Sequence, residues 1–301
     1  MVSRVGGDEV LALVALLRHS NTGKSWRALV NEVREVGAVE MLHREHPPTL
    51  LDLEPTTELL DAAQHDLEAW SGLAKVLTLF DSDFPAQLRE VHDLPPLLFV
   101  RGALADDRGA CIVGSRQASP AALRFASDVA TMLADLQVPV ISGLAEGIDT
   151  AAHTAALSAG GRTVAVIGTG IDKVFPKGNE KLQQQIERDG LVLSQFWPGS
   201  NPTRATFPMR NATMSAYGMC TLVVTAGEQS GARIQARQAV AHGRPLLLTR
   251  DVVTRTEWGQ ELAASAYDVQ VVSDAKDAVG AINRILQRPQ RIDDLLVELT
   301  Q

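Results

Sequence analysis

Glycines, hydroxyl side chains and arginines follow several short apolar runs of this sequence, a combination suited to holding an anion. In CIVGSRQASPAALRF, the residues Gly114, Ser115 and Arg116 come directly after such a run. Ser119 is a good helix N-cap and Pro120 a good first helical residue, so a helix should start just beyond the loop. Backbone N–H groups near a helix start favour negative charge, and an arginine adds a forked contact. The stretch predicts phosphate binding; the alternative is an ordinary turn with a solvated arginine.

The stretch VISGLAEGIDTAAH places two glycines beside acids and a histidine. Ser142 and Gly143 end an apolar run, and Gly147 permits close backbone approach or a positive φ. Asp149 can cap the following helix, and His153 lies four residues on, on the same helix face. A structural hydrogen bond between these two is favoured over catalysis. A triad of Ser142, Asp149 and His153 is conceivable, but no nucleophile elbow supports it.

A third glycine loop lies in VAVIGTGIDKVFPKGN. Gly168 and Gly170 begin like a dinucleotide-binding fingerprint, but Lys173 occupies the place of the third glycine. The position about 20 residues further on, where an acid is expected, is Gln195. Nicotinamide or flavin binding is therefore disfavoured, and we expect no cofactor. A loop that passes close to a ligand fits better, with Lys173 and Lys177 as candidate phosphate partners.

Two further helix starts carry polar residues. Arg210 and Asn211 follow Pro208 in FPMRNATMSAYG and open a predicted helix. They are candidates for the binding site; the alternative is that the asparagine only caps the helix and the arginine lies on the surface. Ser230 and Gly231 in TAGEQSGARIQARQAVAHG follow a buried apolar run and begin another helix. The N-terminus of this helix is a second place where free backbone N–H groups favour an anion.

Signatures of metal or nucleophilic catalysis are missing. SNTGKS supplies Gly-Lys-Ser, but Arg18 stands where a Walker loop needs its first glycine, and no strand precedes it. The patterns HExxH and CxxC are absent, and Cys111 and Cys220 stand alone, which suggests neither a disulfide framework nor a metal cage. We therefore expect no metal and no enzyme activity, because the motifs favour binding over turnover.

The elements that must position these motifs alternate in type from Cys111 onward. The predicted strands are CIVG, VPVISG, RTVAVIG, LVLSQ, CTLVVTA, PLLLT and VQVVS, and the predicted helices lie near 120–136, 149–159, 178–189, 210–218, 230–242, 258–266 and 275–287. Buried strands joined by helical crossovers form a parallel, doubly wound α/β sheet. Ligands bind outside the carboxyl ends of its strands, so the motifs should meet at one edge.

The remaining sequence indicates a small helical domain before the sheet. Residues 8–75 carry apolar positions at helical spacing, with Ser25 as a cap and Pro47 and Pro48 as a break. We expect a helical N-terminal domain over 1–75 and a sheet domain over 76–301, divided into a connector, 76–109, and a core, 110–290. No winged helix is expected after the core.

Composition limits where the protein works and what it binds. The chain has 301 residues and a net charge of −8, which excludes a wholly basic nucleic-acid coat but leaves room for a local basic pocket. VLALVALL is too short to span a bilayer and lacks the features of a signal peptide. We expect a cytoplasmic protein with no membrane partner.

The motifs GSR, SGLAEGIDTAAH, GGRTVAVIGTGIDKVFPKGN, FPMRN and SGARIQA, in this order, resemble the DprA/Smf family. The connector FDSDFPAQLREVHDLPPLLFVRG is similar too, and the resemblance covers roughly residues 76–250. It implies an extended Rossmann-like fold and a homodimer. It also implies a protein that binds single-stranded DNA and helps load a recombinase onto it during uptake of transforming DNA.

The same resemblance implies roles for particular residues. The GSR loop would hold a DNA phosphate, Lys173 would be another basic contact, and Arg210 would line the same pocket. Gly143, Gly147 and Asp149 would shape its wall. The full predicted DNA- and phosphate-binding set is Gly114, Ser115, Arg116, Ser142, Gly143, Gly147, Asp149, Gly168, Gly170, Lys173, Arg210, Asn211, Ser230 and Gly231.

Three departures from the family pattern surround this pocket and keep two alternatives open. RNATMSAYG replaces the usual RNR-I-I-A-G-L-S, Gln195 replaces a usual glutamate, and SGARIQA replaces SG-(small)-LITA, with Arg233 and Gln235 as the polar changes. These changes favour a sensor of a nucleotide derivative as the first alternative. A nucleotide phosphoribohydrolase is less favoured, because its PGGxGT loop reads TAGEQSG here.

Overall fold

The computed structural model describes residues 4–49 and 54–288, and its chain forms two compact units, 1–100 and 101–301. We expected the division after residue 75, whereas residues 76–100 fold with the helical unit. Trp70 accounts for part of this, because its ring packs edge-on against Phe99 with 5.2 Å between the centroids. The last residues of the predicted core, 289–290, and the remainder of the chain lie outside the described part.

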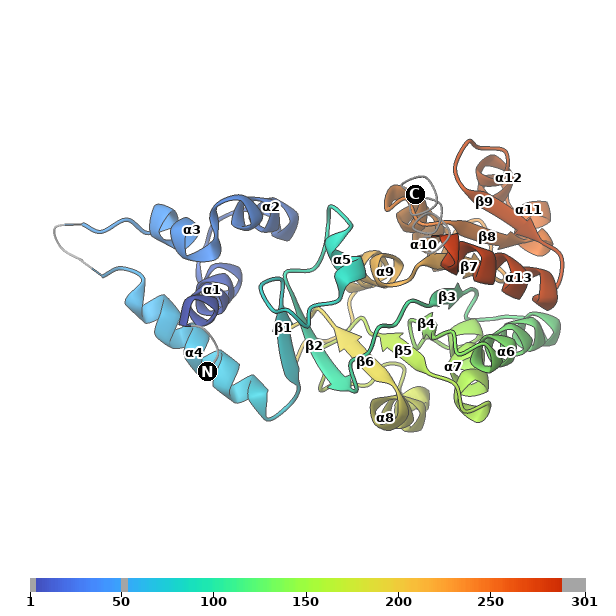
Figure 1. The fold of residues 1–301 in the computed structure, drawn as a ribbon, viewed down its shortest axis with the longest axis horizontal. Helices are drawn as coiled ribbons and strands as arrows, with labels where there is room; N and C mark the ends of the chain where they lie inside the picture. The colour runs from blue at the N-terminus through green and yellow to red at the C-terminus, as the bar shows by residue number, and fades with distance from the viewer. Residues whose placement is uncertain (1–3, 50–53, 289–301) are drawn as a thin grey trace, which may run out of the picture. The chain divides into compact units, whose positions relative to one another are not determined.

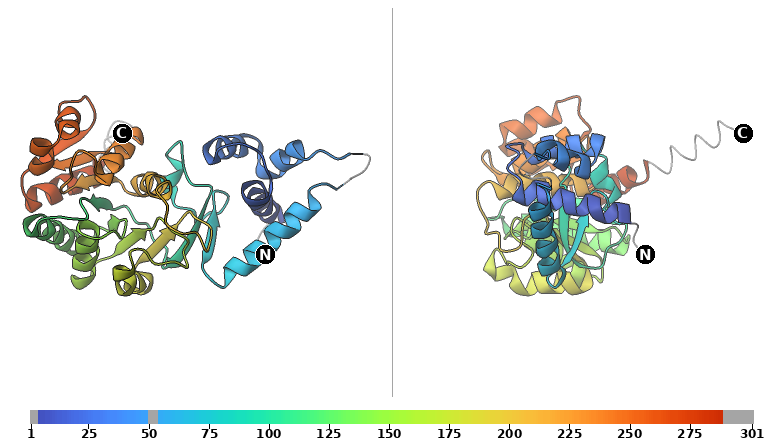
Figure 2. Two further views of the ribbon diagram at one scale, coloured as in Figure 1. Left: turned by 180° about the vertical axis from the view of Figure 1, so that it is seen from behind. Right: turned by 90° about the vertical axis from the view of Figure 1, so that its left-hand side faces the viewer.

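The first unit combines helices with one antiparallel strand pair (Figures 1 and 2). Its elements are α1 (Arg4–Val14), a π-helical turn (Ala15–His19), α2 (Trp26–Val36), α3 (Ala38–Glu45), α4 (Thr57–Ser71), β1 (Lys75–Thr78), α5 (Ala86–Arg89) and β2 (Leu97–Gly102). As predicted, Ser25 caps α2, since its side chain accepts a hydrogen bond from Ala28 N. The helical stretch that begins after Ser25 is divided into α2 and α3 at Gly37, whose φ of 90° interrupts the helix.

A parallel sheet forms the centre of the second unit, as the sequence predicts (Figure 1). Its strands among the described residues are β3 (Ala110–Val113), β4 (Val140–Ser142), β5 (Thr163–Val166), β6 (Leu191–Ser194), β7 (Cys220–Val223), β8 (Leu246–Thr249) and β9 (Val269–Val272). They lie in the order β6-β5-β4-β3-β7-β8-β9, and every neighbouring pair is parallel.

Helical crossovers connect these strands. The helices are α6 (Pro120–Asp135), α7 (Ile148–Ser158), a 3-10 turn (Lys177–Asn179), α8 (Glu180–Asp189), α9 (Thr206–Tyr217), α10 (Gly231–Ala241), α11 (Arg250–Arg255), α12 (Glu257–Ala263) and α13 (Ala275–Leu286). We expected α9 to open at residue 210, but it begins at Thr206, because Pro208 is tolerated within the first turn of a helix. Helix α11 was not predicted. Across residues 4–49 and 54–288, no helix has both the length and the apolar character that crossing a membrane requires.

Alternate residues of β3 face different helices, which shows why the strand is apolar throughout. Ala110 and Ile112 belong to the hydrophobic cluster that α6, α7 and α13 cover. Cys111, between them, donates its thiol hydrogen to the carbonyl of Met214 in α9 at 3.2 Å. The strand is buried on both faces, as expected for the centre of a doubly wound sheet.

The strand order reverses beside β3, and this fixes where a ligand can bind. From β3 the chain moves outward through β4, β5 and β6, and it then returns to place β7 on the other side of β3. The loops after β3 and β7 therefore lead away in opposite directions and leave a crevice between them. Ser115 N donates to Thr225 O at 2.9 Å, which ties the two loops together at the base of this crevice.

A buried ion pair anchors the opposite edge of the sheet. The carboxylate of Asp107 is fully buried and accepts from the guanidinium of Arg162, with one contact at 2.8 Å, and from the Tyr217 hydroxyl at 2.8 Å. Arg162 precedes β5 and Tyr217 ends α9, so this one carboxylate connects three segments that are distant in sequence.

Removing this carboxylate should destabilise the second unit strongly. Asp107→Ala leaves a half-buried guanidinium and a buried hydroxyl without their acceptor, and we expect a loss of about 3–5 kcal/mol in the free energy of unfolding. Asp268→Ala, which breaks an ion pair between two exposed side chains, is the control and should cost about 1 kcal/mol or less. Urea unfolding of both variants measures the difference, and equal losses would contradict the assigned role of Asp107.

Candidate functional site

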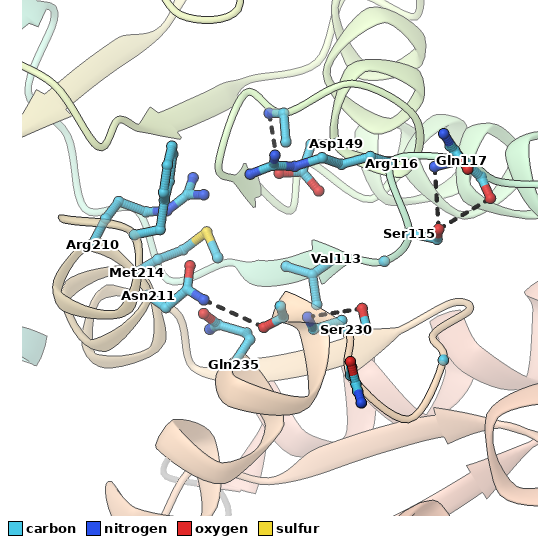
Figure 3. A pocket seen from close by; sticks show the side chains of 17 residues that line it. Val113, Ser115, Arg116, Gln117, Asp149, Arg210, Asn211, Met214, Ser230 and Gln235 are labelled. Atoms are coloured by element: carbon cyan, nitrogen blue, oxygen red, sulfur yellow. Dashed lines mark hydrogen bonds between the residues drawn. The ribbon is translucent and has the colours of Figure 1, made fainter. Parts of the chain in front are cut away.

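A cavity of about 710 Å³ occupies the crevice between the loops after β3 and β7 (Figure 3). We call it the switch-point cavity. Its lining comes from four parts of the chain. These are residues 113–117 at the end of β3 and in the loop that follows, Ala145 and Asp149 before and in α7, Phe207, Arg210, Asn211 and Met214 of α9, and Gly227, residues 229–232 and Gln235 before and in α10. Its volume lies within the range of small-molecule binding sites.

Arg116 is held at this cavity by an aromatic ring. Its guanidinium carbon lies 5.3 Å from the centroid of the Phe207 ring, and the side chain remains exposed. Phe207 also pairs with Phe175, with 5.8 Å between the ring centroids, and Phe175 is 40% exposed. A smaller cavity of about 70 Å³ lies on this side and shares Arg116, Phe207 and Arg210 with the switch-point cavity. The site therefore presents an accessible cation against an aromatic surface.

The Gly114–Arg116 loop uses part of its hydrogen-bonding capacity internally. Besides the bond from Ser115 N to Thr225 O, Gln117 N donates to the Ser115 hydroxyl oxygen at 3.1 Å. Gly114 has no room for a side chain, because a Cβ there would lie 2.6 Å from the side chain of Ile148. Helix α6 starts only at Pro120. The side chain of Arg116 is therefore the group in this loop that is best placed for an anion.

Arg210 has a different position from the one expected. We expected it to line the pocket as a basic contact; it does line both cavities, but it is only 6% exposed. One guanidinium nitrogen donates to the carbonyls of Gly143 and Val166, the latter at 2.9 Å. Burial lowers the pKa of Arg210, and the nearby Asp149 opposes this effect. The residue connects α9 to the ends of β4 and β5 and keeps a positive charge behind the cavity wall.

Asp149 organises the loop before its helix. Its carboxylate accepts from Gly143 N at 3.1 Å and from Ala145 N at 3.3 Å. These two amides bracket Leu144, which has a φ of 57°. Burial raises the pKa of Asp149, and the charge of Arg210 opposes the rise. The expected cap is thus made to the loop preceding α7, not to the helix itself.

The conceivable triad is not assembled. The Ser142 hydroxyl donates to Ile112 O at 2.6 Å, and His153 Nδ1 lies 2.7 Å from the Thr163 hydroxyl. Because that hydroxyl donates its own hydrogen to Val140 O, Nδ1 of His153 must be the donor. The hydrogen bond we expected between His153 and Asp149 is replaced by this one. All of these side chains are buried and serve packing.

Several predicted residues lie outside the switch-point cavity. Gly143 and Gly168 line only the smaller cavity, and Ser142 is buried beneath the sheet edge. Gly147, with a φ of 79°, packs behind the site, where a Cβ would lie 2.4 Å from Ser115 O. Gly170 and Lys173 line neither of these two cavities. Gly170 instead packs against the backbone at Trp197, where a Cβ would lie 2.6 Å from its carbonyl oxygen.

The start of α10 lies at the cavity, as predicted from Ser230 and Gly231. Ser230 caps the helix by accepting from Ala232 N at 3.2 Å. The side-chain amide of Asn211 donates to Gly231 O at 3.4 Å, so Asn211 joins α9 to α10 and is not a cap. Gln235, one turn into α10, lines the same cavity and was noted in the sequence only as a departure.

Phe207 lines the cavity but does not belong to the set of binding residues predicted from the sequence. The signal was available, because Phe207 and Arg210 are three residues apart and so share a helix face once α9 is extended through Pro208. Two of the changed positions are also explained by the structure. The Thr213 hydroxyl donates to the side-chain oxygen of Gln195, and both residues are buried. Among the described side chains, no group of three acids, histidines or cysteines is placed to hold a metal ion.

Fold and site together define a class of protein: a Rossmann-like α/β protein with a cation-bearing cavity at the point where its strand order reverses. The family model for DNA recombination-mediator protein A matches residues 75–283. The chain belongs to this family, which confirms the resemblance to DprA and Smf proteins.

Individual relatives support this assignment. DNA processing protein DprA of Streptococcus pneumoniae is 40% identical over 169 residues, which cover 56% of this chain and 60% of that protein. The match thus spans less than two thirds of the relative's length. The crystal structure of DprA from Streptococcus pneumoniae superposes with a TM-score of 0.72 at 26% identity, covering 91% of this chain and 97% of that one. DprA from Helicobacter pylori has the same fold, with a TM-score of 0.62 at 23% identity, covering 70% of this chain and 97% of that one.

The close contact between Gly143 and Arg210 makes a sharp prediction. A Cβ on residue 143 would lie 1.6 Å from a guanidinium nitrogen of Arg210, so Gly143→Ala must displace that side chain. We expect a loss of about 3 kcal/mol in the free energy of unfolding. Gly227→Ala is the matched control, because it lines the switch-point cavity but its Cβ would meet nothing within 4 Å. Chemical denaturation of both variants tests this, and a Gly143→Ala protein as stable as the control would refute the contact.

His153 should make stability depend on pH. Burial, aided by the charge of Arg210, lowers its pKa from 6.5 to about 3 in the folded protein. Between these values the unfolded chain binds the proton and the folded protein does not. The free energy of unfolding should therefore fall as pH decreases from about 6.5 towards 3, by about 1.4 kcal/mol per unit from this group.

The variant His153→Gln should lack this contribution. Urea unfolding at several pH values compares it with the wild type, and the exposed His43→Gln serves as control. If His153→Gln follows the wild-type slope, His153 is not held neutral in the fold.

Proposed function

We propose that the second unit binds single-stranded DNA at the switch-point cavity. The observation that carries the proposal is Arg116, an exposed guanidinium held over the Phe207 ring at the mouth of a concave site. A guanidinium in this position suits a phosphate oxygen, and its planar fork is already oriented by the ring beneath it. The molecule as a whole carries a net charge of −8, so attraction to DNA must come from such a local site.

The aromatic surface beside Arg116 favours a single strand over a duplex. Phe175 is 40% exposed and its ring centroid lies 5.8 Å from that of Phe207, so the pair offers aromatic surface on which a base could stack. Stacking needs an unpaired base, and it discriminates little between bases because every base has a π-face. The predicted set Gly114, Ser115, Arg116, Asp149, Arg210, Asn211, Ser230 and Gly231 surrounds this position. Within it we assign phosphate binding to Arg116 and the shaping of the cavity to Asp149 and Arg210.

The relatives support a role in DNA processing. The family is described as a recombination mediator, and the structure of the Helicobacter pylori protein is described as showing a single-stranded DNA-binding mode. We propose that this protein assists the loading of a recombinase onto single-stranded DNA, works as a homodimer in the cytoplasm and catalyses no reaction. The engagement of Asp149 with two backbone amides supports the last point, because its carboxylate is already used in the fold.

Replacing Arg116 should weaken DNA binding and its dependence on salt. We expect Arg116→Ala to lose roughly tenfold in affinity for a short single strand and to reduce the salt slope by about 0.7, the value for one phosphate contact. Arg188→Ala removes an equal charge from the exposed C-terminal end of α8. This position lies next to the amino-terminal end of β6, whereas the cavity lies at the carboxyl ends of the strands, so the affinity for DNA should change little.

A salt series of gel shifts or anisotropy titrations, with a matched duplex alongside, measures both effects. A wild-type protein that leaves single strands unshifted at low salt would end the proposal. Equal losses for Arg116→Ala and Arg188→Ala would remove Arg116 from the site.

A further inference from the structure

Gln235 is a buried polar side chain with no hydrogen-bond partner among the described residues. It is 1% exposed, and within residues 4–49 and 54–288 neither its amide nitrogen nor its amide oxygen makes a hydrogen bond. A carboxamide has two donor hydrogens and an acceptor oxygen, and leaving them unpaired inside a protein costs free energy. An apolar residue of similar volume would avoid this cost. The residue therefore calls for an explanation in terms of something other than the stability of α10.

The position of Gln235 provides one, because the residue lines the switch-point cavity. It lies with Asn211 where α9 packs against α10 (Figure 3). The side-chain amide of Asn211 donates there to Gly231 O at 3.4 Å. The opposite part of the cavity carries the guanidinium groups of Arg116 and Arg210. Val113 and Met214 add apolar side chains to the lining of the same cavity.

A cavity with cations at one end, amides at the other and apolar side chains in its lining matches the chemistry of a nucleotide. The phosphate suits the guanidinium end, and the flat apolar faces of a base suit Val113 and Met214. The edge of the base would then reach the carboxamides. A Watson–Crick edge that is read by hydrogen bonds must be unpaired and turned out of its stack.

We propose that Gln235 pairs with the Watson–Crick edge of one nucleobase that enters the switch-point cavity, by turning its carboxamide towards the ligand. The proposal rests on the binding of single-stranded DNA proposed above and assigns a specific contact within it. Each base carries a donor and an acceptor side by side on this edge. A carboxamide that rotates by half a turn matches either order, so Gln235 recognises the presence of a base and not its identity.

The test compares oligonucleotides with and without bases. Anisotropy titrations use a short oligo-dT and an oligomer of the same length made of abasic sugar-phosphates, which preserves the phosphates and removes every edge. The variant Gln235→Met keeps the volume of the side chain and removes its donors and acceptor. We expect the preference for oligo-dT over the abasic strand to fall by roughly tenfold in this variant, as for the loss of about one paired edge. Stacking on Phe175 and Phe207 is unchanged and cancels in the comparison.

Gln238→Met is the matched control, because it makes the same substitution on α10 at a side chain that does not line the cavity. It should keep the wild-type preference. Thermal unfolding provides a second measurement: without DNA, Gln235→Met should melt no lower than the wild type, since it removes an unpaired buried amide. An unchanged preference, or a clearly lower melting temperature, would overturn the proposal.

A failure of DNA binding itself gives a different result. If the wild type binds neither strand, thermal shifts with thymidine monophosphate decide the matter. If thymidine monophosphate stabilises the wild type but not Gln235→Met, the contact between Gln235 and a base is supported, with a free nucleotide as the ligand. If it stabilises neither protein, the proposed contact is rejected. Oligo-dA and oligo-dC complete the series, and a loss confined to one base would overturn recognition independent of identity.

Discussion

The buried guanidinium of Arg210 is the contact on which the rest of the site depends. Its hydrogen bonds to the carbonyls of Gly143 and Val166 satisfy backbone acceptors at the carboxyl ends of β4 and β5. Leaving carbonyl groups unpaired in a buried place would be costly. The same side chain fixes α9 across the sheet edge. Phe207, one turn earlier on α9, is then brought beneath Arg116.

The position of the Arg210 guanidinium explains why the loop after β4 contains glycine. Gly143 gives the guanidinium its space, and Gly147 allows the loop before α7 to press against the carbonyls of Ser115 and Arg116. Asp149 then holds the short segment between them by two amide contacts. The glycines and the acid that suggest chemistry in the sequence act here mainly as supports for two aromatic rings and one exposed cation.

Periodicity was enough to predict the wound sheet and the edge at which the site lies, because buried parallel strands and amphipathic helices leave strong local patterns. The Gly114–Arg116 loop was found for the same reason, since it follows β3 directly. The sequence does not predict the burial of Arg210, because its partners are backbone carbonyls at the ends of two other strands and any residue type can supply a carbonyl. Asp149 was assigned to a cap, but its target depended on the path of residues 143–145 in three dimensions. The sequence marks Gln235 only as a departure from the family pattern, because burial without a hydrogen-bond partner among the described residues is a property of the three-dimensional structure.

The buried pair of Gln195 and Thr213 has an evolutionary consequence. The amide oxygen accepts from the hydroxyl, so each side chain supplies what the other lacks. Changing the threonine alone to an aliphatic residue would leave the amide oxygen unpaired, and changing the glutamine alone to an aliphatic residue would leave the hydroxyl without its acceptor. The two positions are therefore coupled, because the residue at each one limits the other to side chains that complete the hydrogen bond.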